Sequence, residues 1–224
     1  MSNVISRREL LKRATMAGAA AVTPVGRHAP SENSISAPVL QSAVARDPYE
    51  HLTAMESDVL EAIVARIIPT DANGPGAREA RAASYIDRAL GGALASSRPL
   101  YGVGLAAVDR LARSTKGNAF TALLPEEQDV ILSELERGEV PDFTGAAEFF
   151  ALVRAHTIQG TFCDPYYGGN AGFVGWDLIG YPGVRTFVSP DDQRLGADVP
   201  ANHKSAYDYE MFTKAATGAA PAGR

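Results

Sequence analysis

The sequence has very few of the residues from which cross-links and metal sites are built. Its 224 residues include one cysteine, Cys163, and four histidines. A lone cysteine excludes an internal disulfide framework and any cysteine-rich zinc or iron–sulfur site within this chain. The histidines form no H-x-x-x-H or H-E-x-x-H pair; they are His28, His51, His156 and His203. We therefore expect no metal site in this chain.

Basic residues and long apolar runs are also scarce. The chain has 21 Lys and Arg residues against 26 Asp and Glu residues, a net charge of −5, so we expect no binding to nucleic acid. No segment approaches the ~20 unbroken apolar residues that a membrane-spanning helix needs. What remains, 46% hydrophobic and 21% charged residues, is typical of a globular protein with one sizeable core.

The first residues are typical of an export signal. Residues 4–24 read VISRRELLKRATMAGAAAVTP, a basic region followed by a weakly apolar stretch rich in Ala and Gly. The twin-arginine pattern S-R-R-x-hydrophobic-L-K is matched by Ser6, Arg7, Arg8, Leu10, Leu11 and Lys12. Because such signals send folded proteins across the bacterial inner membrane, we expect residues 1–26 to be a signal peptide bound by the Tat translocase, and the protein to be periplasmic. The alternative is a basic amphipathic helix at the start of a cytosolic protein.

Hydrophobic spacing predicts a mainly α fold for the rest of the chain. Residues 27–50 are rich in Ser, Ala and Pro and are interpreted as a linker. Thr53 and Glu56 form a capping-box pattern, and Pro125 and Gly138 bracket a further helix. We predict a compact domain over residues 51–190 with about five helices, over residues 53–68, 77–90, 100–116, 125–137 and 144–162.

Glycine and aromatic residues dominate the segment that follows. Residues 163–187 hold six glycines and few aliphatic residues, which predicts a long irregular loop and not another helix. Nine of the 17 aromatic residues of the chain lie between Phe149 and Phe187, so we expect this loop to pack onto a surface. Residues 191–224 are interpreted as an extended tail with one apolar patch, made of Tyr207, Tyr209, Met211 and Phe212.

The aromatic loop is predicted to be largely a partner interface. Irregular backbone with so many aromatic side chains would expose a large apolar patch in an isolated chain, and such patches mark partner surfaces. The predicted interface residues are Phe162, Asp164, Tyr166, Tyr167, Gly168, Gly169, Asn170, Phe173, Gly175, Trp176, Gly180, Tyr181, Pro182 and Gly183. The competing interpretation is that the loop folds back onto its own helices and that Trp176 belongs to the core. Cys163 is either a buried thiol or disulfide-bonded to another chain.

No catalytic cluster can be assembled from the sequence. His156 lies on a predicted helix beside Phe149 and Phe150, which favours a core or interface histidine over a base or ligand. Two other function classes remain open at this point. One is a periplasmic oxidoreductase or hydrolase that uses His156 and Asp164, and the other is a stand-alone sugar-binding module in which Trp176 or Tyr181 stacks on the ring.

Several motifs together resemble the gluconate 2-dehydrogenase subunit 3 family. The first is Phe149-Phe150-x-Leu152, and the second runs Thr157-x-x-Gly160-x-Phe162-x-Asp164-Pro165-x-Tyr167-Gly168-Gly169-Asn170. The third is Gly175-Trp176-x-x-Ile179-Gly180-Tyr181-Pro182-Gly183, and Ile67-Ile68-Pro69-x-Asp71 with Gly74-Pro75-Gly76 also fits. The resemblance covers residues 52–183, and Cys163 departs from it, since a small residue such as Ser is expected there as often.

The resemblance implies an accessory role and not a catalytic one. Members of this family resemble small, cofactor-free subunits of glucose–methanol–choline (GMC) type flavoprotein dehydrogenases, which oxidise gluconate, fructose, glucose or glucosides. FAD is then expected in the large subunit, and haem c in a cytochrome partner. The resemblance further implies a hitch-hiker and chaperone role, in which the signal on the small subunit exports both proteins as a folded heterodimer.

Overall fold

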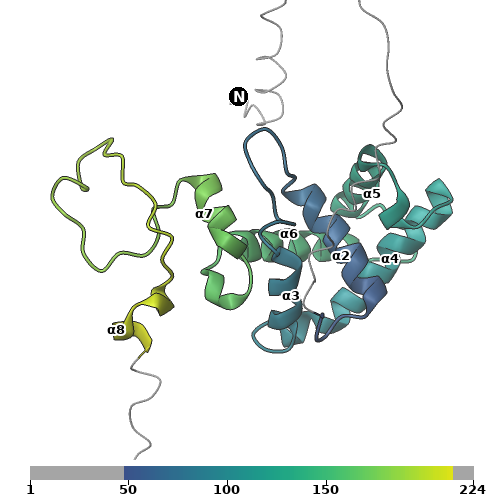
Figure 1. Cartoon of the computed structure of the whole chain (residues 1–224). Helices are drawn as coiled ribbons and strands as arrows, with labels where there is room; N and C mark the ends of the chain where they lie inside the picture. The colour runs from purple at the N-terminus through teal and green to yellow at the C-terminus, as the bar shows by residue number, and fades with distance from the viewer. Residues whose placement is uncertain (1–47, 214–224) are drawn as a thin grey trace, which may run out of the picture. The chain divides into compact units, whose positions relative to one another are not determined.

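The computed structural model describes residues 48–213 and is built from helices (Figure 1). Within that range there are seven α-helices and no β-strand, which confirms the predicted mainly α class. The α-helices are α2 (Ala54–Ile67), α3 (Ala82–Leu90), α4 (Arg98–Lys116), α5 (Pro125–Arg137), α6 (Ala146–Phe162), α7 (Val174–Ile179) and α8 (Glu210–Thr213). The 3-10 turns are η1 (Ala95–Ser97), η2 (Phe120–Ala122), η3 (Pro165–Tyr167), η4 (Ala171–Phe173) and η5 (Ala206–Asp208). In this range no helix is both long and apolar enough to cross a membrane.

Helices α2 and α5 begin and end where local sequence signals place them. At the start of α2 the Glu56 amide donates to Thr53 Oγ1 (3.3 Å), and the Thr53 amide donates to Glu56 Oε2 (2.8 Å). This reciprocal capping box satisfies two backbone donors that a helix start leaves open. Pro125 occupies the first turn of α5, and Gly138 ends it at a φ of 71°. Both helices have the predicted limits within a residue or two.

The predicted start of α3 is wrong and that of α6 is two residues early, because turns precede both helices. Residues 77–80 form a turn, and α3 begins only at Ala82 because Arg81 adopts a left-handed φ of 58°, which no α-helix accommodates. Before α6, Thr144 and Gly145 lie in a turn, and the amide of Ala146 donates to the carbonyl of Phe143 (3.2 Å). The side chain of Phe143 is thereby buried ahead of the helix.

The predicted long loop is also interrupted by a helix. α7 occupies residues 174–179, within the segment for which no helix was expected. The start of α7 depends on two features. The side chain of Asn170 accepts from the amide of Gly175, and Phe173 takes a left-handed φ of 65° just before the helix. Neither feature appears as a pattern of apolar residues in the sequence. The prediction therefore relied on the glycine content of the segment, and the predicted absence of a helix there is wrong.

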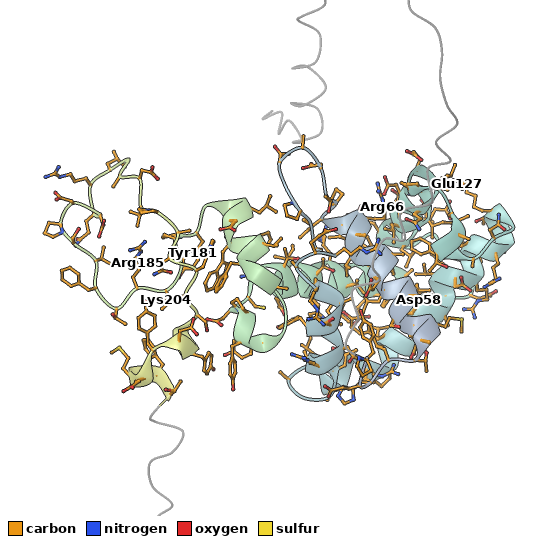
Figure 2. All side chains as sticks on the ribbon, viewed as in Figure 1. Asp58, Arg66, Glu127, Tyr181, Arg185 and Lys204 are labelled. Atoms are coloured by element: carbon orange, nitrogen blue, oxygen red, sulfur yellow. The ribbon has the colours of Figure 1, made fainter. Side chains whose placement is uncertain are left out.

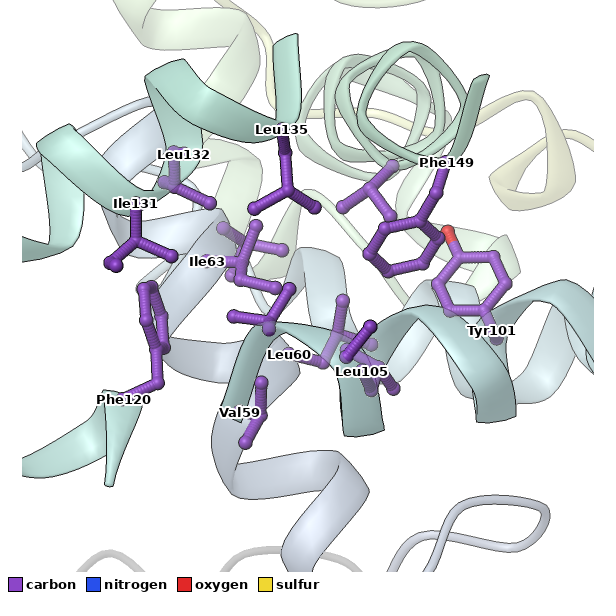
Figure 3. Close-up of a cluster of buried hydrophobic side chains, with 14 of the residues drawn as sticks. Val59, Leu60, Ile63, Tyr101, Leu105, Phe120, Ile131, Leu132, Leu135 and Phe149 are labelled. Atoms are coloured by element: carbon purple, nitrogen blue, oxygen red, sulfur yellow. The ribbon is translucent and has the colours of Figure 1, made fainter. Parts of the chain in front are cut away.

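The core lies between α2, α3, α4, α5 and α6, and Figure 3 shows a cluster of its side chains. α2 contributes Leu60 and Ile63, α4 contributes Tyr101 and Leu105, and Phe149 enters from α6. Each fully buried aliphatic side chain of this kind is worth about 1.5–3 kcal/mol of transfer free energy. On the outside of the same bundle, Arg66 of α2 donates two hydrogen bonds of 2.8 Å to the carboxylate of Asp129 on α5.

Candidate partner-binding surface

The segment after α6 first serves to cap that helix. The last carbonyls of an α-helix have no partner within it. Here the carbonyl of Gly160 accepts from the amide of Asn170 (2.9 Å), and that of Phe162 accepts from Trp176 Nε1 (3.0 Å). The carbonyl of Cys163 accepts from Asn170 Nδ2 (2.8 Å). The glycine-rich segment is therefore folded back against the carboxyl end of α6.

Asn170 links the end of α6 to the start of α7. Its side chain is fully buried, and its backbone takes a left-handed φ of 44°, which Asn tolerates better than most residues. While Nδ2 holds the Cys163 carbonyl, Oδ1 accepts from the amide of Gly175 (2.7 Å) and, at 3.4 Å, from that of Trp176. One side chain thus positions both helices.

Two glycines permit this close approach. A Cβ at Gly169 would lie 2.1 Å from the carbonyl oxygen of Gly160, and one at Gly175 would lie 1.8 Å from that of Thr161. Both distances are impossible for a real side chain, and the clashing atoms belong to the backbone. Gly169 and Gly175 are therefore required for packing against α6.

Trp176 lies within the fold of this chain. Its side chain is 5% exposed, and its ring packs beside Phe173 (centroids 5.3 Å apart) and edge-on to Tyr181 (4.8 Å). This arrangement agrees with the competing interpretation of the sequence, in which the loop folds back onto the helices of its own chain and Trp176 belongs to the core. The predicted interface residues Gly169, Asn170, Gly175 and Gly183 are also buried. Phe162, Asp164, Gly168, Phe173 and Pro182 are half-buried, and Tyr166, Tyr167, Gly180 and Tyr181 are exposed.

Asp164 connects this segment to residues near the end of the described chain. Its Oδ1 accepts from the amide of Tyr166 (3.0 Å) and from Ser205 Oγ (2.6 Å). Oδ2 accepts from the amide of Ala206 (2.9 Å). Nearby, His203 Nε2 lies 2.7 Å from Asp177 Oδ1 on α7. Residues that the sequence suggests are an extended tail are thus joined to the glycine-rich segment.

Between Val184 and Lys204 the chain forms a loop that leaves α7 and returns toward α8 (Figure 1). The neck of the loop is closed by the amide of Val184, which donates to the carbonyl of Lys204 (3.0 Å), and by the amide of Asn202, which donates to that of Pro182 (3.0 Å). Figure 2 labels Tyr181, Arg185 and Lys204 close to this neck. The loop carries the exposed apolar side chains of Phe187, Val188 and Leu195.

Three tyrosines, Tyr166, Tyr167 and Tyr207, gather where the returning chain meets η3, and we call them the tyrosine cluster. The rings of Tyr166 and Tyr207 are stacked with centroids 3.5 Å apart, and Tyr167 is edge-on to both. The hydroxyls of Tyr167 and Tyr207 are hydrogen-bonded at 3.2 Å. All three side chains remain exposed to solvent, by 61%, 51% and 37% respectively.

A groove of about 640 Å³ lies between α3 and α6 beside this cluster. It is mostly apolar, and its lining residues are Tyr85, Arg88, Ala89, Ala93, Ile158, Gln159, Phe162, Cys163 and Tyr167. Burial raises the pKa of the Cys163 thiol to about 11. The described chain holds this thiol free, and its pairing with another chain stays a prediction that a non-reducing gel of the complex would check. A second groove, of about 600 Å³, lies between α2 and α4.

His156 and Asp164, the pair of the alternative catalytic interpretation, serve separate structural contacts. His156 is buried on α6, and its Nδ1 lies 3.0 Å from the hydroxyl of Tyr101. Burial lowers the pKa of His156 and raises that of Tyr101, so both are neutral at pH 7 and the tyrosine can donate to the imidazole. The Asp164 oxygens are occupied by Tyr166, Ser205 and Ala206.

Two further predicted features are placed as follows. Among residues 48–213, no group of three or more His, Cys, Asp or Glu side chains is arranged to hold a metal ion. The predicted export signal, Ser6 to Lys12, lies outside the described residues.

The sequence analysis did not predict the structural roles of Asn170 and Asp164, although Asn and Asp before short turns are known capping signals.

Comparison with known protein families finds a match over much of the chain. The model of the family described as gluconate 2-dehydrogenase subunit 3 matches residues 54–183, which is more than half of the chain. The match includes α2 to α7 and ends before the loop that leads to Ser205 and Tyr207. No curated protein and no solved structure matches this chain.

Proposed function

This chain belongs to the gluconate 2-dehydrogenase subunit 3 family, and from that membership we propose that it is the non-catalytic small subunit of an FAD-dependent, GMC-type sugar dehydrogenase complex. The family name denotes a subunit of a dehydrogenase complex. Membership in the family therefore supports the association of this chain with a larger catalytic protein. In the proposal FAD belongs to the large subunit and haem c to a cytochrome partner.

The distribution of exposed apolar side chains supports a partner-binding role. Of the 15 large hydrophobic side chains that are exposed in residues 48–213, eleven lie between Ile158 and Phe212. Exposed apolar surface gathered in one part of a chain is typical of a protein interface. In contrast, the polar groups that sequence reasoning offered for catalysis, His156 and Asp164, are engaged in contacts within the chain.

In the proposal this chain also carries the export signal of the complex. Arg7 and Arg8 form the twin-arginine pair of the predicted signal, and the large subunit is expected to depend on it. The small subunit would then act as a chaperone, because the pair must fold and assemble in the cytoplasm before it crosses the membrane together. The mature complex would be periplasmic.

Replacing both arginines by lysine tests the export step. The Arg7→Lys/Arg8→Lys variant keeps the charge of the signal and is expected to retain both subunits in the cytoplasm. Arg13→Lys is the matched control, because Arg13 lies in the same basic region but outside the twin-arginine pair. The measurement is dehydrogenase activity and subunit content in periplasmic and cytoplasmic fractions of cells that co-express the large subunit. Periplasmic dehydrogenase activity that survives the double substitution would contradict the hitch-hiker role.

A further inference from the structure

The tyrosine cluster is ordered by contacts from two distant parts of the chain. Tyr166 and Tyr167 belong to η3, directly after α6, and Tyr207 belongs to η5, 40 residues further along the chain. The backbone that carries Tyr207 is held because Asp164 accepts from Ser205 and Ala206. The amide of Tyr207 in turn donates to Ser205 Oγ (3.0 Å). The three rings are therefore fixed relative to one another in the chain without a partner.

The three side chains of the tyrosine cluster are thus both ordered and exposed, which suits them to bind a partner. Tyrosine adds large contact area at a low cost in conformational entropy, and it is enriched at the energetic centres of interfaces. Side chains already held in place lose less entropy on binding. Phe187 and Leu195 in the loop between Val184 and Lys204 are exposed too, but within the described residues the ring of Phe187 packs on no other aromatic ring.

We propose that the tyrosine cluster, completed by Tyr207 from beyond the family-matched region, is the anchor by which this chain binds the large dehydrogenase subunit. This inference rests on the proposed function and names its contact surface. The family match ends at residue 183, so Tyr166 and Tyr167 lie inside it and Tyr207 lies outside. Residues beyond the family domain would then help to determine which large subunit this chain accepts.

The chemistry of the cluster indicates the surface that it fits. The hydrogen bond with Tyr167 raises the pKa of Tyr207 to about 12, so this hydroxyl is neutral at physiological pH. Asp164 and Asp177 are paired with donors of the chain itself. The centre of the surface is therefore uncharged and aromatic, and Tyr167 continues it into the apolar groove between α3 and α6.

Charge at the edges of this surface completes the description of the partner. Charges of both signs lie there: Asp208 follows Tyr207 directly and is exposed, with its Oδ2 accepting from the amide of Ser205 (2.8 Å), and Arg88 lines the adjoining groove. Charges at the rim of an interface mainly set orientation and the rate of association. The matching surface of the large subunit would have an apolar centre that receives the tyrosine rings, with a Lys or Arg residue facing Asp208 and an Asp or Glu residue facing Arg88.

Binding of the purified large subunit to purified variants of this chain tests the anchor. Tyr207→Ala should raise the dissociation constant by about 30-fold or more, as truncation of a central aromatic anchor does. Tyr207→Phe keeps the stack on Tyr166 and loses only the hydroxyl contact, so a loss of less than about tenfold is expected. Met55→Ala is the control, because Met55 is exposed by 63%, compared with 37% for Tyr207 and 61% for Tyr166, but lies on α2. It should bind as the wild type does.

Circular dichroism and melting curves accompany the binding measurements. If Tyr207→Ala loses native structure, Tyr166→Ala replaces it, because this ring forms the other half of the stack. Wild-type affinity in a folded Tyr207→Ala or Tyr166→Ala variant would overturn the anchor. So would a dimer of this chain alone that these substitutions dissociate, because the cluster would then bind a second copy. Failure of the wild-type chain to bind any large subunit would instead overturn the proposed function itself.

Discussion

The carboxylate of Asp87 holds three consecutive backbone N–H groups. It is buried on α3 and accepts from the amides of Glu50 (2.6 Å), His51 (3.0 Å) and Leu52 (2.8 Å). A charged acceptor with several N–H donors contributes more than a neutral hydrogen bond does, and its loss leaves donors without partners. This one residue therefore anchors the first described residues to α3.

We predict that Asp87→Ala lowers the free energy of unfolding by about 3 kcal/mol, because three donors lose their acceptor at once. Asp87→Asn, which keeps one acceptor oxygen, should lose less. Urea denaturation followed by circular dichroism measures both changes. Asp58→Ala serves as the control, because Asp58 is exposed on α2 and should change stability by no more than about 0.5 kcal/mol. Equal stability of the Asp87 and Asp58 variants would refute this account.

The thiol of Cys163 is predicted to react slowly in the folded chain. Burial raises its pKa from an ordinary 9.0 to about 11, and only the thiolate attacks a disulfide reagent. Below pH 9 a difference of two pKa units corresponds to about 100-fold less thiolate. Because a thiolate of higher pKa is also more nucleophilic, the rate of reaction with Ellman's reagent at pH 8 should be about tenfold lower in the native chain than in urea. Equal rates in the two states would show that the thiol is not shielded.

At the scale of elements, Trp176 adds a large side chain to the contact between α6 and α7 that Asn170 also holds. Trp176 of α7 donates to the carbonyl of Phe162 at the end of α6, and its ring is held between Phe173 and Tyr181. Since α7 has only six residues, it is too short to be stable without such contacts. Packing and capping, not helix propensity, maintain this element.

We predict that Trp176→Ala destabilises the isolated chain by about 3 kcal/mol, as removal of a buried aromatic residue does. Trp176→Phe should retain part of the packing and lose the hydrogen bond, so its stability should lie between those of the wild type and the alanine variant. The control is Phe187→Ala, since Phe187 is 76% exposed and makes no contribution to the core. Thermal melts of the isolated chain measure the effect. If Trp176→Ala melts normally but fails to bind the large subunit, Trp176 belongs to the interface instead.

At the scale of the whole molecule, we predict that the purified chain contains no flavin, haem or stoichiometric metal. The proposed function places the redox cofactors in the partners, and the one cysteine and the scattered histidines of this chain supply no ligand set. The absorption spectrum, metal analysis and a dye-reduction assay with sugars measure this. Full activity is expected when the large subunit is added. Dye reduction by the small subunit alone would contradict the accessory role.

Sequence alone determined the elements whose signals are local. The helical spacing of apolar residues predicted α2 to α6, and the caps at Thr53 and Pro125 set two of their boundaries. The motifs between Phe149 and Gly183 also led to the family that the comparison confirmed. These features are readable because their partners lie within a few residues, where helix geometry alone fixes which side chains meet.

Only the tertiary structure decided what the glycine-rich segment does. Asp164 meets Ser205 across 41 positions of sequence, and Asn170 joins two helices by opposite ends of one side chain. No periodicity encodes such contacts, because they depend on where the backbone returns and not on the spacing of residue types. For the same reason Trp176 could be placed in the core, and Tyr207 in an exposed cluster with Tyr166 and Tyr167, only once the fold was known.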